Sequence, residues 1–394
     1  MMKRRISVWE TINVIFTILL AFVLTYKAPI RYLEFHGNEG LASSLGTFTI
    51  YGAILFAMMI IVTRKDYLKY SIIILFWFGF LYVYQRIVVP SETLSTYWQT
   101  FFINGFSGFL CGIALRKPKQ LVFAAGAFSL FYGILLIPEP ITRSLLGYTS
   151  MNLGYTMAPL TIWLIMLWYY SDRFKKPILI VAILLGSMTL LFTSRGCGIS
   201  VVAAAIIVKI IDSKRKNEPI SRLVIGFSIA IIAAMFIFRE FAAYFVLRSD
   251  ISLLTGSTLN KLMNGMFADD NGRGKLLSLA IDLFKKNWVL GVGMGADRKI
   301  IGYVFPHNII IEILLHFGLV LSIVIFGSYW KSLIKAIKIS FPTEYAILLP
   351  TICCIYWIRL LFSDSYLSNS FGLMFILGFS IQMICKYRTG ELNE

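Results

Sequence analysis

The residues best suited to chemistry lie where a polar segment meets an apolar helix, at Pro306-His307-Asn308. A neutral imidazole near pH 7 can accept a proton from a hydroxyl group, which makes His307 a candidate general base. The competing interpretation is a histidine at a helix start whose ring is satisfied by backbone or water. His316, nine residues further along the expected helix, is predicted to contribute mainly packing.

Arginines are the second chemical signal, because a planar guanidinium binds phosphate oxygens with two hydrogen bonds. Thr193-Ser194-Arg195-Gly196 joins two apolar segments that are both shorter than a typical membrane crossing of about 20 residues. The turn should therefore lie below the membrane surface and face a cavity, where a cation is costly and usually functional. The alternative is that Arg195 extends to the lipid headgroups. The arginines on this predicted side are Arg86, Arg143, Arg195, Arg239, Arg248, Arg273, Arg298 and Arg359.

The elements that must position these residues are membrane spans. Hydrophobic residues make up 58% of the chain and the mean hydropathy is +0.77, which excludes a soluble globular class. Hydropathy and segment length predict an all-α polytopic membrane protein with about twelve transmembrane helices. The predicted segments are Thr11–Tyr26, Ser43–Val62, Tyr70–Val89, Tyr97–Leu115, Leu121–Ile137, Tyr155–Tyr170, Ile178–Thr193, Cys197–Ile211, Ile220–Phe238, Asn308–Tyr329, Tyr345–Phe362 and Tyr366–Cys385.

The distribution of lysine and arginine predicts the orientation. With the N-terminus inside, 22 of the 37 lie on the inner side and six lie in short outer segments. The other nine lie in one long loop, residues 239–305, which the positive-inside rule does not count. Both termini are therefore expected in the cytoplasm and the long loop outside. The net charge of +17 then mainly anchors the inner leaflet, and nucleic acid is not an expected partner.

Beyond the spans, the sequence predicts one integral membrane domain, residues 1–394, with a structured large loop. The apolar pattern of the segment Lys275–Trp288 predicts an amphipathic helix at the outer interface. Its apolar side would carry Leu276, Leu277, Ala280, Ile281, Phe284 and Trp288. Residues 291–295 (GVGMG) predict a flexible turn, because no βαβ unit is available for a nucleotide site. No CxxC pair exists and Asp269-Asp270-Asn271 lacks the distal glutamate of a calcium loop, so no metal site is predicted.

Together these positions resemble the O-antigen ligase and oligosaccharide repeat-unit polymerase superfamily. The resemblance lies in Ser194-Arg195-Gly196, Gly272-Arg273, Gly291-Val292-Gly293 and Pro306-His307-Asn308, followed by Glu312 and Gly318. The ligase-type pattern is a histidine and an amide residue, nine residues, a glycine, and a further small or polar position. The chain keeps His307, Asn308 and Gly318 but has Leu321 at the last position. The motif region runs from Thr193 to Leu321, and the rest of the chain agrees in topology.

The resemblance implies a metal-independent glycosyltransferase that needs no cofactor and uses sugars linked to undecaprenyl diphosphate. Its place would be the bacterial cytoplasmic membrane, with the active site on the outer face. Arg195 and Arg273 suit the diphosphate leaving group, whose developing charge needs preorganised cations. His307 would be the base for a sugar hydroxyl, which Asn308 could orient. Arg239 and Arg359 are the further substrate-binding candidates, and the resemblance suggests an inverting displacement.

Three functions compete. A polymerase moves the growing O-antigen or capsule chain onto a new lipid-linked repeat unit, whereas a ligase moves the finished glycan to lipid A core. The departure at Leu321 favours the polymerase, with a chain-length regulator and a flippase as candidate partners. A lipid-oligosaccharide transporter commonly has paired halves with intramembrane charges in both, and no such symmetry is visible here. A purely structural membrane protein would explain neither Arg195 nor the other outer arginines.

Overall fold

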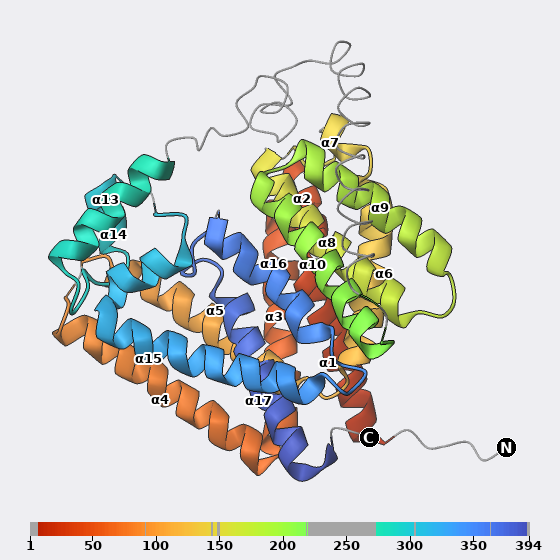
Figure 1. The fold of residues 1–394 in the computed structure, drawn as a ribbon, viewed down its shortest axis with the longest axis horizontal. Coiled ribbons are helices and arrows are strands. Elements are labelled where there is room, and N and C mark those ends of the chain that lie inside the picture. The colour runs from red at the N-terminus through yellow and green to blue at the C-terminus, as the bar shows by residue number, and fades with distance from the viewer. Residues whose placement is uncertain are drawn as a thin grey trace. The chain divides into compact units, whose positions relative to one another are not determined.

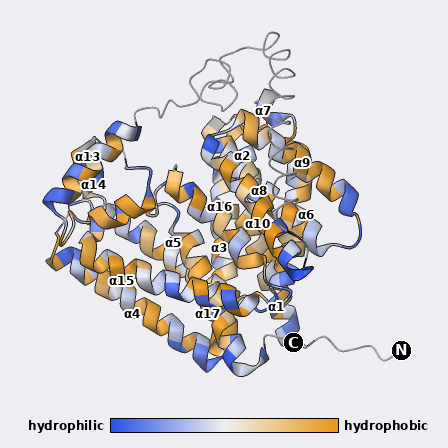
Figure 2. Cartoon of the chain, viewed as in Figure 1, coloured by the Kyte–Doolittle hydropathy of each residue, from blue (hydrophilic) through white to orange (hydrophobic). Residues whose placement is uncertain are grey.

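The computed structural model describes residues 7–217, 219 and 273–391, apart from residues 91, 143, 144, 148, 149, 303, 304 and 363. Every regular element in this part of the chain is a helix (Figure 1). Nine of the described helices are long and apolar enough to cross a membrane. Hydrophobic residues run along the helices, while hydrophilic ones gather toward helix ends and connections (Figure 2). The predicted class, an all-α polytopic membrane protein, is confirmed.

Eleven of the twelve predicted spans coincide with described helices. These are α1 (Val8–Thr25), α3 (Glu39–Val62), α4 (Lys65–Ile87), α5 (Leu94–Ala114), α6 (Pro118–Leu136), α8 (Ser150–Tyr170), α9 (Lys175–Phe192), α10 (Arg195–Arg215), α15 (Ile309–Ser340), α16 (Leu348–Phe362) and α17 (Ser370–Thr389). The remaining span, Ile220–Phe238, lies outside the described residues. The count of twelve therefore stays a prediction.

Local sequence signals explain where several helices begin and end. Ser7 and Glu10 form a capping box at the start of α1, which satisfies backbone N–H groups that the first turn leaves unpaired. Pro118 opens α6, where a missing N–H costs nothing. Gly390 ends α17 with a left-handed φ of 77°.

One compact unit comprises the described parts of residues 1–56, 116–269 and 345–355. Within it α8 packs against α6, α9 and α10, and α1 packs against α6. Its core holds side chains from several of these helices, including Leu136, Met157, Leu160, Leu164 and Leu185. The short helices α2 (Lys27–Phe35) and α7 (Glu139–Thr142) also belong to this unit. Glu139 is buried and accepts hydrogen bonds from the backbone N–H groups of Leu145 and Leu146, both at 2.8 Å.

The second unit comprises the described parts of residues 57–115, 270–344 and 356–394. Its central pair is α5 and α17 (Figure 1). Gly108 and Gly112 on α5 and Gly378 on α17 lie in the contact between the two helices, and a Cβ atom at any of the three would overlap backbone of the other helix. Small residues at this four-residue spacing let helices in a membrane approach closely. Helix α4 packs on α5, and α15 packs on α17.

The predicted amphipathic helix is present as α13 (Arg273–Lys286), which packs against α15. Ala280 is fully buried, while Ser278 and Lys285 on the opposite side are exposed. Leu276, Leu277, Ile281 and Phe284 are partly buried, as the apolar pattern predicts. The prediction was wrong for Trp288, because the helix ends two residues earlier and this side chain is 51% exposed.

Candidate functional site

His307 and Asn308 stand at the start of α15. Asn308 is the N-cap, and its side-chain oxygen accepts hydrogen bonds from the N–H groups of Ile310 and Ile311 at 3.0 and 3.2 Å. His307 has a left-handed φ of 55°, which costs a residue with a Cβ atom about 1–2 kcal/mol. Its ring centre lies 4.3 Å from that of Phe305. The candidate base is thus fixed by a helix cap on one side and an aromatic contact on the other.

Helix α15 is interrupted at Gly318, where φ is 68° and ψ is 178°. The interruption frees the carbonyl of Leu315 and the N–H of Leu319, which would bond to each other in a continuous helix. The Val292 N–H donates to the Leu315 oxygen at 2.6 Å, and the Leu319 N–H donates to the Trp288 oxygen at 2.7 Å. The segment between α13 and α14 (Ala296–Ile301) therefore completes the backbone pairing of α15.

The glycine positions of this contact have a steric reason. A Cβ atom at Gly318 would overlap the carbonyl of Val289, and one at Gly291 would lie 2.6 Å from the Leu315 oxygen. Both residues also have positive φ values, which side chains disfavour. The turn predicted at residues 291–295 is confirmed, and its partner is the glycine that follows His307 and Asn308 in the sequence pattern.

His316 lies in α15, two residues before the interruption at Gly318, and is fully buried. Its Nε2 atom is 2.7 Å from Asp297 Oδ1, and its Nδ1 atom is 2.6 Å from the Tyr366 hydroxyl. Burial by itself raises the pKa of Asp297, but the interactions with His316 and Arg298 outweigh it and lower the pKa below its usual value. The lowered pKa favours the carboxylate form of Asp297, whose Oδ1 is paired with His316 Nε2, and the Gly295 N–H also lies 3.2 Å from that nitrogen.

Glu312 and Arg298 form a second buried pair beside the first. The Arg298 guanidinium donates to Glu312 Oε1 at 3.3 Å and to the Ser365 hydroxyl at 2.5 Å. The Tyr366 N–H donates to the other Glu312 oxygen at 3.2 Å. Burial disfavours the Arg298 cation, yet Glu312, Tyr97 and Asp297 raise its pKa above the usual value. The Arg298 guanidinium lies 4.3 Å from the centre of the Tyr97 ring, so it remains a stacked and paired cation.

Asp297, Glu312 and His316 offer donor atoms within 4.8 Å of one another, a spacing that suits a metal ion. However, Asp297 Oδ1 is already paired with His316, and Glu312 already binds Arg298, Ser365 and the Tyr366 N–H. The Arg298 cation compensates part of the negative charge and so weakens the attraction for a metal ion, while Asp297 Oδ2 has no hydrogen-bond partner among the described residues. The predicted metal independence stays a prediction.

Three arginines of the second unit bind the end of α16 or the short loop that joins it to α17. Arg273 donates to the Phe362 carbonyl at 2.6 Å, Arg359 forms an ion pair with Asp364, and Arg298 binds Ser365. Two of them, Arg273 and Arg359, are candidates from the sequence. The structure brings these arginines together at the end of α16 and on the loop that also contacts Glu312 and His316 of α15.

Arg195 and Arg239 are placed differently. Arg195 is the first residue of α10 in the other unit, with Ser194 as N-cap, and only two residues separate α9 from α10. The near absence of a loop is confirmed, but α10 has 21 residues, not the 15 predicted. Since α10 is therefore of ordinary crossing length, its length no longer argues that the turn lies deep. Arg239 lies outside the described residues.

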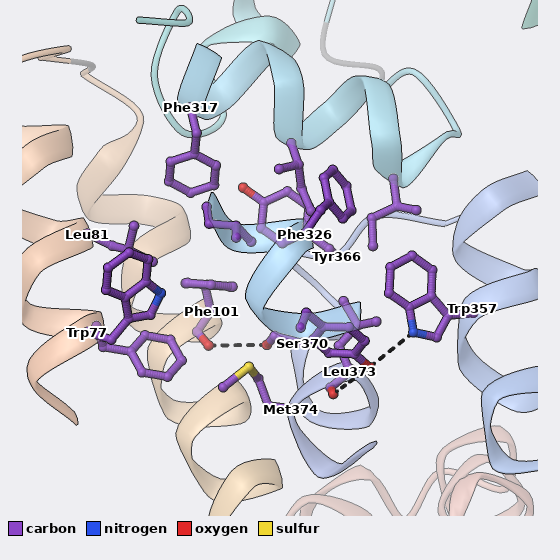
Figure 3. Close-up of a pocket in the computed structure, with 15 residues that line it drawn as sticks. Trp77, Leu81, Phe101, Phe317, Phe326, Trp357, Tyr366, Ser370, Leu373 and Met374 are labelled. Atoms are coloured by element: carbon purple, nitrogen blue, oxygen red, sulfur yellow. Dashed lines mark hydrogen bonds between the residues drawn. The ribbon is translucent and has the colours of Figure 1, made fainter. Parts of the chain in front are cut away.

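A small apolar cavity of about 90 Å³ adjoins the buried network (Figure 3). The rings of Phe101, Phe317, Trp357 and Tyr366 border it. Ile309 and Ile313 line it as well, and they follow Asn308 directly on α15. The Ser370 hydroxyl at its wall donates to the Phe101 carbonyl at 3.2 Å, so its polar lining is already paired.

Sequence reasoning missed Asp297, Arg298 and Tyr366 as members of a network, and it assigned His316 to packing. One signal was available: Asn308, Glu312 and His316 are spaced four residues apart, which places them on one face of an apolar helix. Ionisable residues on such a face are functional candidates by default. The partners of Glu312 and His316 could not be found, because they lie 14 to 54 residues away in the chain.

Comparison with known proteins agrees with the resemblance found in the sequence. Residues 179–326 match the family model described as O-antigen ligase. The matched region includes α9, α10, α13, α14 and the part of α15 that carries His307, Asn308 and Gly318 at or near its start. No curated protein and no solved structure matches the chain.

Proposed function

We propose, from the O-antigen ligase family match of residues 179–326, that this membrane protein is a glycosyltransferase that polymerises lipid-linked sugar repeat units. The observation that carries the proposal is that Arg273 and Arg359 meet at the end of α16 and the loop that follows it, where they bind the Phe362 carbonyl and Asp364. That loop is hydrogen bonded to α15, the helix that His307 and Asn308 begin.

The donor in this proposal is a growing glycan on undecaprenyl diphosphate. Breaking the bond between the sugar and the diphosphate leaves negative charge on phosphate oxygens, which positioned guanidinium groups stabilise. Arg273, Arg195, Arg239 and Arg359 would bind these oxygens. The aromatic cavity beside Ile309 and Ile313 would accept a short apolar part of the lipid. No cofactor and no metal enters this scheme.

The acceptor is a sugar hydroxyl on a second lipid-linked repeat unit. His307 would remove its proton as the oxygen attacks the anomeric carbon, and Asn308 would orient the sugar through its amide. The resemblance favours inversion at that carbon. The reaction would take place on the outer face of the bacterial cytoplasmic membrane, with a chain-length regulator and a flippase as partners.

A ligase is the second candidate, favoured by the description of the matched family. Both reactions use the same donor, so donor-binding arginines do not separate them. The acceptor does: a polymerase extends a lipid-linked repeat unit, whereas a ligase glycosylates lipid A core. Leu321, at the place where the ligase-type pattern has a small or polar residue, supports the polymerase.

The test uses the purified full-length protein in nanodiscs with a synthetic lipid-linked repeat unit. Removing a positioned base should lower turnover by about 10²–10⁴-fold, so His307→Ala should leave the repeat unit largely unused. His36→Ala is the matched control, because His36 is exposed at the end of α2 and its ring nitrogen lies 2.8 Å from the Tyr32 carbonyl of that helix. Near-normal turnover in His307→Ala, or loss of wild-type turnover with a chelator, would show that the metal-free base mechanism is wrong. Transfer to lipid A core, without extension of the repeat unit, would establish the ligase.

A further inference from the structure

Two buried polar pairs join α15 to α14, and the proposed chemistry uses neither of them. Glu312 binds Arg298, and His316 binds Asp297, so two residues one turn apart on α15 hold two adjacent residues of α14. The side chains of Glu312, His316 and Asp297 are fully buried, and that of Arg298 is 13% exposed. Buried charges are costly unless paired, so a role beyond simple packing is expected for such a cluster.

We propose that Glu312 and His316 are positioning residues for His307: by fixing Arg298 and Asp297 of α14, they hold the Arg298 guanidinium beside the Phe305 ring, against which the His307 ring packs. This inference rests on the proposed function, in which His307 is the base. Neither residue touches the substrate in this scheme. They act through α14 and the residues that follow it.

A series of contacts connects the Glu312–Arg298 pair to His307, while the His316–Asp297 pair holds the same helix, α14. The Arg298 guanidinium lies 5.4 Å from the centre of the Phe305 ring, and that ring lies 4.3 Å from the His307 ring. His307 also has the left-handed backbone conformation that a non-glycine residue keeps only where its surroundings enforce it. Arg298 is therefore the link between the buried carboxylate of Glu312 and the aromatic contact of the candidate base.

The loop between α16 and α17 gives the same pairs a second anchor. Ser365 bonds to both Arg298 and Glu312, and the Tyr366 hydroxyl bonds to His316. A change at Glu312 thus removes one of the contacts that fix Arg298, and we expect the guanidinium to shift toward those that remain, Ser365 and Tyr97. Displacement of a reacting group by about 1 Å can cost about 10²-fold in rate.

The first arm of the test is kinetic. Glu312→Gln keeps the shape of the side chain but cannot neutralise Arg298, and Arg298→Lys keeps the charge but loses the planar fork. Each is expected to lower kcat by about 10–100-fold, with the KM for the lipid-linked unit changed less than about threefold. Glu139→Gln is the matched control, because it alters an equally buried glutamate in the other unit.

A double-mutant cycle separates positioning from general destabilisation. If Glu312 acts through His307, Glu312→Gln should lower the residual kcat of a His307→Ala protein by less than about threefold. An equal loss in both backgrounds, measured per folded molecule, would overturn the positioning role. If Glu312→Gln fails to fold, Arg298→Lys takes its place and is measured in the same two backgrounds, wild type and His307→Ala.

The second arm needs no activity and so distinguishes the two proposals. The chain has three histidines, so isotope labelling of the histidine rings gives only three resonances, which single substitutions assign. Glu312→Gln should shift or broaden the His307 resonance, because the nearby Phe305 ring moves, and leave that of His36 unchanged. An unaltered His307 resonance would overturn the inference even with His307 established as the base. A shifted resonance with full turnover in His307→Ala would uphold the structural link and refute the proposed base.

Discussion

At the residue scale, the two histidines of α15 have opposite surroundings. His307 is partly exposed at the start of the helix, whereas His316 is fully buried between Asp297 and Tyr366. A general base must reach a hydroxyl of an external acceptor, which the surroundings of His307 permit and those of His316 prevent. The prediction that His316 contributes mainly packing did not include its two side-chain hydrogen bonds, to Asp297 and Tyr366.

The arginines give the first prediction at this scale. Replacement of Arg195 or Arg273 by lysine keeps the charge but loses the planar fork that binds two phosphate oxygens. We expect polymer formation to fall by about 10²–10³-fold in each variant. Gel analysis of glycan length at matched protein level measures this. The control is Arg64→Lys, because Arg64 is an arginine that forms an ion pair with Glu391 at 2.6 Å. Wild-type polymer length in Arg195→Lys would exclude Arg195 from the donor site.

The carboxylate of Asp297 predicts a pH-dependent stability. Its pKa is lowered in the folded protein, so the unfolded chain takes up a proton first as the pH falls. Its contribution is therefore complete above the ordinary aspartate pKa of about 4 and disappears as the pH falls through the lower folded value. Asp297→Asn should lower the melting temperature at pH 7, with the difference from wild type narrowing toward pH 3.

Thermal unfolding in detergent, with the exposed Asp282→Asn as control, measures this difference. A difference in melting temperature between wild type and Asp297→Asn that stays constant from pH 7 to pH 3 would mean that the Asp297 carboxylate is not stabilised by its partners.

At the element scale, the interruption of α15 is the feature that builds the site. Gly318 releases two backbone groups, and the segment after α13 binds both. This places α14 beside α15, and α14 supplies Asp297 and Arg298. The glycine of the family pattern therefore has a structural role, since it creates the place where the large loop returns to the membrane helices.

Substitution of that glycine gives the next prediction. Gly318→Ala would force a side chain into a left-handed conformation at roughly 1–2 kcal/mol, and its Cβ would overlap the Val289 carbonyl. We expect clear thermal destabilisation and loss of polymer. Gly327→Ala on the same helix is the matched control, because its Cβ meets nothing within 4 Å. That change should be neutral or stabilising by up to about 1 kcal/mol. Equal melting temperatures for the two variants would contradict the role of the interruption.

At the scale of the whole molecule, the family-matched region draws on both compact units. Residues up to 269 belong to one and residues 270–326 to the other. Arg195 therefore comes from one unit, while His307, Arg273 and Arg359 come from the other. The arginine substitutions above therefore test each unit separately, with Arg195→Lys in the first and Arg273→Lys in the second.

The predicted orientation can be tested on the intact protein. Alkaline phosphatase, which is active only outside the cytoplasm, should be inactive when fused after Glu394 and active when fused after Asp270. A green fluorescent protein fused after Glu394 should fluoresce. The charge asymmetry of the short loops is the physical reason, because positively charged loops stay on the cytoplasmic side. The reverse pattern of activities would place the proposed site on the wrong face.

The sequence by itself determined the features that depend on neighbouring residues. Hydropathy over about 20 residues identified eleven described spans, and a helical repeat identified α13, because both signals are local. His307 and Asn308 could be singled out for the same reason, since a polar cap before an apolar helix is visible in a few letters. Helix lengths were less certain, as α10 and α15 show, because polar ends continue a helix without a hydropathy signal.

Only the tertiary structure decided which residues meet. Arg273 reaches Phe362 across 89 positions of the chain, Arg298 reaches Ser365 across 67, and His316 reaches Tyr366 across 50. Such pairs depend on how α15 is interrupted and on how the loops close, and no local pattern encodes that. Burial then gives these contacts their effect, because it removes water from the charged groups and leaves each one dependent on its partner.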